Sequence, residues 1–168
     1  MKKETEQLKK QIKWMMLFFM TALIISGATA IPVEWELSTF LSDNPADTAL
    51  SKLLHHVLEA VRETNYKFPF LMYGYDWLAF AHFVIAVVFI GVIKDPVRNI
   101  WVIEFGTIAC LMIIPFAFLF SAIRGLPVWW SVIDSSFGIF GILPLWWTRK
   151  KILLLEKLQA EDKLNTFF

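Results

Sequence analysis

The sequence predicts an all-α, polytopic membrane protein with a four-transmembrane-helix bundle. Of its 168 residues, 57% are hydrophobic, including 16 Phe and 8 Trp, which is too apolar for an ordinary soluble chain of this size. Crossing the hydrocarbon of a bilayer takes about 20 helical residues, and a helix satisfies its own backbone hydrogen bonds there. Four apolar runs meet that length within the usual tolerance: residues 12–31, 77–93, 100–123 and 127–147.

The first run, residues 12–31, follows a lysine-rich start and ends near Ala28-Thr29-Ala30, which looks like a signal-peptide cleavage site. We expect it to be retained as a helix. It is long for the apolar part of a signal peptide, and its removal would break the even number of spans. Residues 1–13 are expected to extend this helix into water.

The longest non-spanning segment, residues 32–76, is predicted to carry an amphipathic helix over 46–63. Asn44 has the character of an N-cap, and Pro45 follows it at the first helical position. Apolar residues then recur at helical spacing, with charged residues on the remaining face. Two roles stay open: a lid over the mouth of the bundle, or an anchor on the outer leaflet.

A tight turn separates the second and third runs, because Pro96 prevents the second helix from continuing. Glu104 lies about one helical turn inside the border that follows this turn. Lys94 or Arg98 is the expected partner that neutralises Glu104, which makes a structural clamp the favoured interpretation. After the fourth run, leucines spaced among charged residues predict that the last helix continues beyond the membrane.

The distribution of positive charge predicts the topology. Twelve of the 16 Lys and Arg residues flank the runs on the side of the two termini, and four lie in the other two segments. By the positive-inside rule, both termini are expected in the cytoplasm, with residues 32–76 outside it. The Trp residues fall at or near the predicted borders, where indole rings favour the headgroup zone. They are Trp14, Trp35, Trp77, Trp101, Trp129, Trp130, Trp146 and Trp147.

Ionisable residues inside or at the ends of the runs are the candidate functional residues, since a charge in hydrocarbon needs a partner, water or neutrality. Their helical positions group them with small residues. In the fourth run Ser131, Asp134 and Ser135 share a face with two glycines. In the third, Arg124 shares a face with Gly106, Cys110, Ala117 and Ser121. In the second, His82 lies between Ala79 and Ala86.

This arrangement predicts a polar binding pocket in the outer half of the bundle, in which an arginine pairs with the Asp134 carboxylate and a histidine accepts or relays a proton. The alternative is a structural lock, in which Asp134 accepts a hydrogen bond between two helices and the arginine reaches lipid headgroups. The binding set is Asp134, Arg124, His82, Asp76, Ser131 and Ser135.

No cofactor or metal site is expected. His55 and His56 are adjacent and cannot share a helical face, and Cys110 is the only cysteine. Glycine-rich phosphate loops and nucleophile elbows are missing from the sequence. Because the basic residues flank the runs, the expected partners are membrane lipids rather than nucleic acid.

Five strings between Asp76 and Trp147 resemble a family of small bacterial four-span membrane proteins of uncharacterised function. The resemblance implies no particular activity. From the spans and the charge distribution, we expect the chain in the inner, cytoplasmic membrane. The strings are Asp76-Trp77-Leu78-Ala79-Phe80-Ala81-His82, Asp95-Pro96-Val97-Arg98-Asn99, Trp101-Val102-Ile103-Glu104-Phe105-Gly106, Arg124-Gly125-Leu126-Pro127 and Asp134-Ser135-Ser136-Phe137-Gly138.

Three functions are compatible with these observations. The first is binding or transport of a small amphiphile, a lipid or a proton through the predicted pocket. The second is an accessory or structural subunit, whose polar residues pair with another protein in a membrane complex. The third is a lipid-modifying enzyme that uses His82 and Asp134. A non-enzymatic role is favoured over the third.

Overall fold

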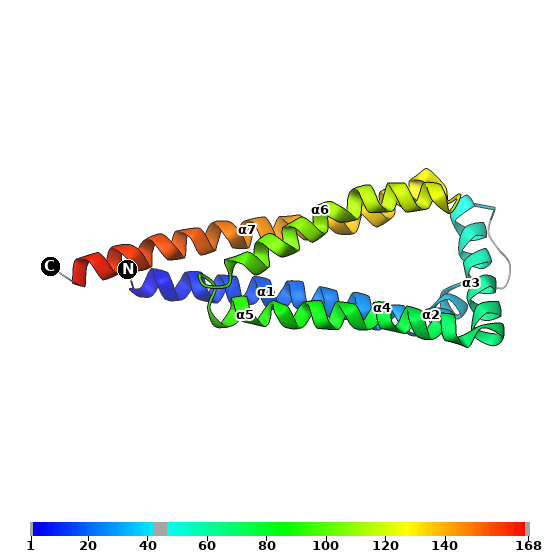
Figure 1. Ribbon diagram of the computed structural model, residues 1–168, viewed down its shortest axis with the longest axis horizontal. Helices are drawn as coiled ribbons and strands as arrows, with labels where there is room; N and C mark the ends of the chain where they lie inside the picture. Colours follow the sequence, from blue (N-terminus) through cyan, green and yellow to red (C-terminus); the bar gives the residue numbers. More distant parts are fainter. Residues whose placement is uncertain (1, 42–46, 167–168) are drawn as a thin grey trace. The chain divides into compact units, whose positions relative to one another are not determined.

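The computed structural model describes residues 2–41 and 47–166, and within these ranges all regular structure is helical (Figure 1). Four candidate spans in the described residues are long and apolar enough to cross a membrane: Lys3–Ala30, Pro69–Lys94, Ile100–Ile123 and Val128–Asn165. The predicted all-α, four-span class is therefore confirmed. The helices are α1 (Lys2–Ala30), α2 (Val33–Phe40), α3 (Ala49–Lys67), α4 (Pro69–Val88), α5 (Ile90–Lys94), α6 (Ile100–Ile123) and α7 (Val128–Thr166).

Three of the helices are longer than the apolar runs that predict them. Helix α1 begins at Lys2, within the lysine-rich start, and α7 continues to Thr166. Helix α4 begins at Pro69 rather than at residue 77, because proline is well tolerated in the first turn of a helix. Helix α6, in contrast, has the bounds of the predicted third run.

The chain divides into two compact units, which are described separately. Unit 1 contains residues 1–20 and 88–168, and unit 2 contains residues 21–87. The first part of α1 belongs to unit 1 together with α5, α6 and α7. The remainder of α1 belongs to unit 2 together with α2, α3 and most of α4.

Helices α6 and α7 form an antiparallel hairpin that makes up most of unit 1 (Figure 1). A Schellman turn joins them. The Gly125 amide donates to the Ala122 carbonyl at 3.2 Å, and the Leu126 amide donates to the Ser121 carbonyl at 2.9 Å. Gly125 has φ +69°, a left-handed conformation that glycine adopts without steric cost.

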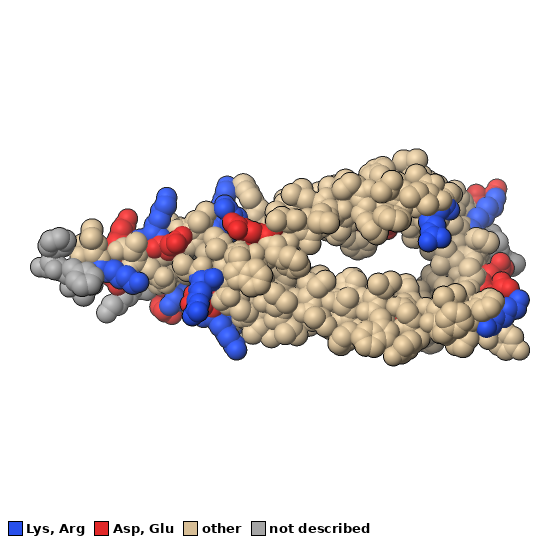
Figure 2. Space-filling view, in the orientation of Figure 1, with Lys and Arg blue, Asp and Glu red and all other residues tan. Residues whose placement is uncertain are grey.

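Large apolar side chains form the core of unit 1 near the chain termini. The Phe89 ring packs edge-on against Phe19, with 5.0 Å between centroids. Buried residues recur every three or four positions along α1 and α7, the spacing that keeps one helical face covered. They are Leu8, Ile12, Met16 and Phe19 on α1, and Leu145, Thr148, Ile152 and Leu155 on α7. On the face shown in Figure 2, charged side chains gather over the first turns of α1 and the last turns of α7.

In unit 2, polar contacts join α2 to α3. The Asn65 amide donates to the Glu34 carboxylate at 2.9 Å, and Arg62 forms an ion pair with the same carboxylate at 3.8 Å. On the last turn of α3, Lys67 donates to Glu63 at 2.7 Å, and this hydrogen bond holds the pKa of the Glu63 carboxyl below its usual value. The pair supports the C-terminal end of the helix.

The bounds predicted for this helix, 46–63, are wrong at both ends. It begins at Ala49, because the Thr48 side chain caps it by accepting a hydrogen bond from the Ser51 amide at 3.2 Å. It continues to Lys67 and stops at Phe68, because a residue that precedes proline is disfavoured in the helical conformation. Asn44 and Pro45, the predicted start signal, lie outside the described residues.

Candidate functional site

Three serines, Ser121, Ser131 and Ser135, lie on facing sides of the α6–α7 hairpin near its turn, and we call them the hydroxyl seam. All three are buried. The Ser121 hydroxyl donates to the Phe118 carbonyl at 3.2 Å, and it also forms a short hydrogen bond with the Ser131 hydroxyl. Either of the two hydroxyls can donate to the other. This chain of hydrogen bonds ties α7 to α6.

Small residues let the two helices approach closely next to the seam. A Cβ atom added to Gly138 would collide with the Cys110 carbonyl oxygen, and one added to Gly141 would lie 2.8 Å from the Cys110 Sγ. Contacts of that length are repulsive. The glycines therefore allow a backbone separation that larger side chains would prevent.

Ser135 differs from the other two serines because its hydroxyl has no hydrogen-bond partner among the described residues, although the oxygen is buried. Leaving a buried hydroxyl unsatisfied costs about 1–3 kcal/mol. The preceding residue, Asp134, is half-buried within the same candidate span. An unsatisfied hydroxyl and a carboxyl group are therefore neighbours on one turn of α7.

The predicted ion pair between Arg124 and Asp134 is not formed. Ion pairs in the described part of the chain join other residues, and neither of these two takes part in them. Arg124 is the C-cap of α6, where its amide donates to the Phe120 carbonyl at 3.0 Å, and the residue is exposed. The chain leaves the helix there, so Arg124 does not continue the buried face that ends at Ser121.

The other two members of the predicted set, His82 and Asp76, belong to α4 in unit 2. The His82 Nδ1 lies 3.0 Å from the Leu78 carbonyl oxygen. A carbonyl only accepts, so Nδ1 carries the proton, and Nε2 is an acceptor when the ring is neutral. Asp76 is exposed. The six predicted residues thus fall into two groups, four on unit 1 and two on unit 2.

Sequence reasoning missed one close neighbour of His82. Gly27 is buried in the part of α1 that belongs to unit 2, and an added Cβ would lie 2.7 Å from the Ala79 carbonyl oxygen and 2.9 Å from the His82 Cβ. The helical spacing of Ala79, His82 and Ala86 on α4 already indicated a face of small residues that another helix can approach closely. Gly27, in the first apolar run, was the sequence signal that this run packs against that face of α4.

The partner of Glu104 also differs from the prediction. Neither Lys94 nor Arg98 pairs with it; instead Arg149 of α7 donates to the Glu104 Oε1 through Nε at 3.2 Å and through Nη2 at 3.1 Å. The α5–α6 turn uses other bonds, since the Asn99 side chain donates to the Gly91 and Asp95 carbonyls at 3.0 and 2.9 Å. The clamp therefore joins α6 to α7 within the hairpin.

No cluster of three or more His, Cys, Asp or Glu residues that could hold a metal ion exists within the described ranges. Comparisons with protein-family models, with curated proteins and with solved structures gave no match. Any function assigned to this chain must therefore come from its own residues.

Proposed function

We propose that this chain is a multi-pass protein of the cytoplasmic membrane, with both termini in the cytoplasm, that binds or moves a small amphiphile, a lipid or a proton at Asp134. The excess of Lys and Arg on the side of the termini supports the orientation. The observation that carries the binding proposal is the juxtaposition of Asp134, without an ion-pair partner among the described residues, with the unsatisfied Ser135 hydroxyl.

Hydrocarbon does not readily tolerate a charged side chain. A carboxylate in a transmembrane helix costs about 3 kcal/mol or more unless it is paired, hydrated or neutral. Asp134 forms no ion pair among the described residues, although Arg124 belongs to the same hairpin. A bound amine, a hydroxyl, water or a transferred proton would each satisfy it, and the Ser135 hydroxyl can donate to or accept from the same ligand.

Two of the other predicted residues have supporting roles in this proposal. Arg124, at the end of α6, attracts anionic groups toward the turn of the hairpin, and Ser131 holds the hairpin closed through Ser121. His82 and Asp76 belong to unit 2, and the proposal at Asp134 does not depend on them. Helix α3 is proposed to be amphipathic and to cover the extracytoplasmic mouth or to lie on the leaflet beside it.

The test is the substitution Asp134→Asn, with Glu161→Gln, an exposed carboxylate farther along the same helix, as the matched control. Proton movement is measured with a pH-sensitive dye in vesicles that contain the protein. Retained amphiphiles are measured by native mass spectrometry after mild detergent extraction. We expect the unchanged protein to give at least one of these signals and Asp134→Asn to lose it, while the control keeps it.

Thermal stability in detergent separates binding from a structural lock. If Asp134→Asn keeps its folded yield and melting temperature within a few degrees but loses the signal, the binding proposal is supported. If the folded yield collapses, Asp134 is a structural hydrogen-bond acceptor. Absence of both signals in the unchanged protein would also contradict the proposal.

A second candidate function is that of an accessory subunit. Most side chains in the four candidate spans are exposed, with only 17% to 22% of each window buried. Such a surface can contact another membrane protein as well as lipid, and Asp134 could then pair with a basic residue of that protein. Gentle extraction should in that case recover a stoichiometric partner, whereas recovery of this chain alone argues against the role.

A further inference from the structure

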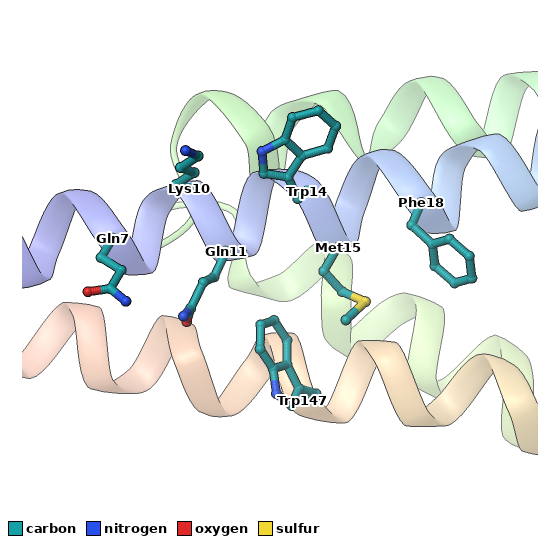
Figure 3. Close-up of a pocket in the computed structure, with 7 residues that line it drawn as sticks. All are labelled: Gln7, Lys10, Gln11, Trp14, Met15, Phe18 and Trp147. Atoms are coloured by element: carbon teal, nitrogen blue, oxygen red, sulfur yellow. The ribbon is translucent and has the colours of Figure 1, made fainter.

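A groove lies within unit 1, between the N-terminal part of α1 and α7, far along α7 from the hydroxyl seam. Its volume is about 760 Å³, within the range of small-molecule sites. In Figure 3, Gln7, Gln11 and Met15 extend from α1 toward α7, and Trp147 extends from α7 toward α1. The full lining is Gln7, Lys10, Gln11, Trp14, Met15, Phe18 and Trp147.

The chemistry of the groove changes along its length. The residues nearer the N-terminus, Gln7, Lys10 and Gln11, are polar or charged, and the next three, Trp14, Met15 and Phe18, are apolar. From Gln7 to Phe18 the helix rises about 16 Å, at 1.5 Å per residue. The groove therefore offers a polar end and an apolar end at the point where α1 passes from its lysine-rich start into the apolar run of residues 12–31.

One lysine lines the groove, and a second lies beside its Trp147. Lys10 lines it and takes part in none of the ion pairs among the described residues, whereas the neighbouring Lys9 lies 3.6 Å from Glu6. On α7, the Lys151 ammonium, which does not itself line the groove, lies 5.2 Å from the ring centroid of Trp147. That distance is within the range of a cation–π contact. Both ammonium groups can donate hydrogen bonds to an anion.

The third observation is an unsatisfied polar atom. The Oε1 of Gln11 is buried and has no hydrogen-bond partner among the described residues, and Gln11 lines the groove. A carboxamide both donates and accepts. The unsatisfied atom is the acceptor, so it fits a donor such as a headgroup hydroxyl rather than a phosphate oxygen.

We propose that this groove binds one anionic phospholipid. Its phosphate lies near Lys10 and Lys151, a headgroup hydroxyl donates to the Gln11 carboxamide oxygen, and one acyl chain runs along Trp14, Met15 and Phe18. Charge complementarity selects an anionic headgroup, and the apolar end requires an acyl chain, which a free phosphate lacks. The position also fits, because aromatic and basic residues flank membrane borders. This site uses no residue of the proposed Asp134 site.

The test uses the full chain in lipid nanodiscs that contain phosphatidylcholine with a minor fraction of phosphatidylglycerol bearing a photoreactive acyl chain. We expect cross-links on Trp14, Met15, Phe18 or Trp147, and fewer with the phosphatidylcholine analogue. Lys10→Gln and Lys151→Gln should each lower retention of phosphatidylglycerol in native mass spectra about five-fold, as expected for one basic residue near an anionic lipid.

Two lysines provide matched controls. Lys13 is on α1 but does not line the groove, and Lys150 stacks 3.5 Å over the ring of Trp146, which is also outside it. Lys13→Gln and Lys150→Gln should change retention less than two-fold. Equal losses in all four variants would indicate nonspecific attraction to a basic surface and overturn the proposal.

A further variant tests the acyl-chain end of the groove without changing any charged residue. Met15→Trp fills the apolar end and should abolish the acyl-chain cross-links while Lys10 and Lys151 stay in place. Unchanged cross-linking in Met15→Trp, equal retention of the two lipids, or a second copy of the chain seated in the groove in place of lipid would each contradict the proposal.

Discussion

The two ends of unit 1 are built from different kinds of side chain. Near the chain termini, large residues such as Ile12, Phe89 and Leu155 fill the core, and charged residues surround it. Near the α6–α7 turn, the buried residues are small (serines, alanine, glycine and cysteine), and the surface around them is apolar. Hydrophobic burial drives packing where water surrounds a helix, whereas between helices in lipid, close approach and hydrogen bonds must replace it. Small buried side chains and hydroxyls near the turn are therefore the packing expected of two helices in lipid.

The largest expected effect on the free energy of unfolding is at the end of unit 1 that is packed with large side chains. Ile152 is fully buried, so Ile152→Ala removes buried methyl groups and leaves a cavity. We expect a loss of about 2–5 kcal/mol in the free energy of unfolding, measured by denaturant titration in detergent. Leu164→Ala, at a site 62% exposed on the same helix, should change it by less than about 0.5 kcal/mol. A similar small effect at both sites would show that this end is not a packed core.

A smaller effect on stability is expected near the hydroxyl seam, where it tests the close approach of α6 and α7. Alanine at Gly138 would collide with the Cys110 carbonyl, and overpacking of this kind costs about 1–3 kcal/mol. Gly74 is also helical, and an added Cβ there has no atom within 4 Å. Gly74→Ala should therefore stabilise the protein slightly, through helix propensity. We expect the melting temperature to fall for Gly138→Ala and to rise slightly for Gly74→Ala. A higher melting temperature for Gly138→Ala would refute the close contact.

The smallest effect concerns the hydrogen bond between Ser121 and Ser131. Ser131→Ala should cost about 0.6 kcal/mol, the average for such bonds between membrane helices. Ser121 keeps its bond to the Phe118 carbonyl, which limits the loss. A double-mutant cycle with Ser121→Ala isolates the pair. Coupling energy near zero would mean that the seam is held by packing alone.

The sequence predicted elements with local end signals more accurately than contacts between elements. Helix α6 has its predicted bounds because Pro96 stops the preceding helix and Gly125 provides the turn that follows. The start of α3 was misplaced because two segments, around Asn44 and at Thr48, both offer capping side chains. Only the structure distinguishes them, through the Thr48–Ser51 bond.

The candidate site was predictable in part. Helical periodicity placed Ser121, Cys110 and Gly106 on one face of α6, and the structure buries all three. Periodicity cannot extend past a helix end, so the reach of Arg124 toward Asp134 was misjudged. The Glu104 partner was missed for a different reason. Arg149 is far away in the sequence, and only the antiparallel hairpin brings the two side chains together.

The length of α7 has a mechanical consequence. Its 39 residues rise about 58 Å, nearly twice the ~30 Å thickness of the hydrocarbon, and the helix continues through Pro144. Asp134 lies near one end of this rod, and Trp147 and Lys151 lie well along it. If α7 tilts as one rigid helix at Asp134, the segment around Trp147 and Lys151 moves on the other side of the bilayer. No second element is needed to transmit the motion.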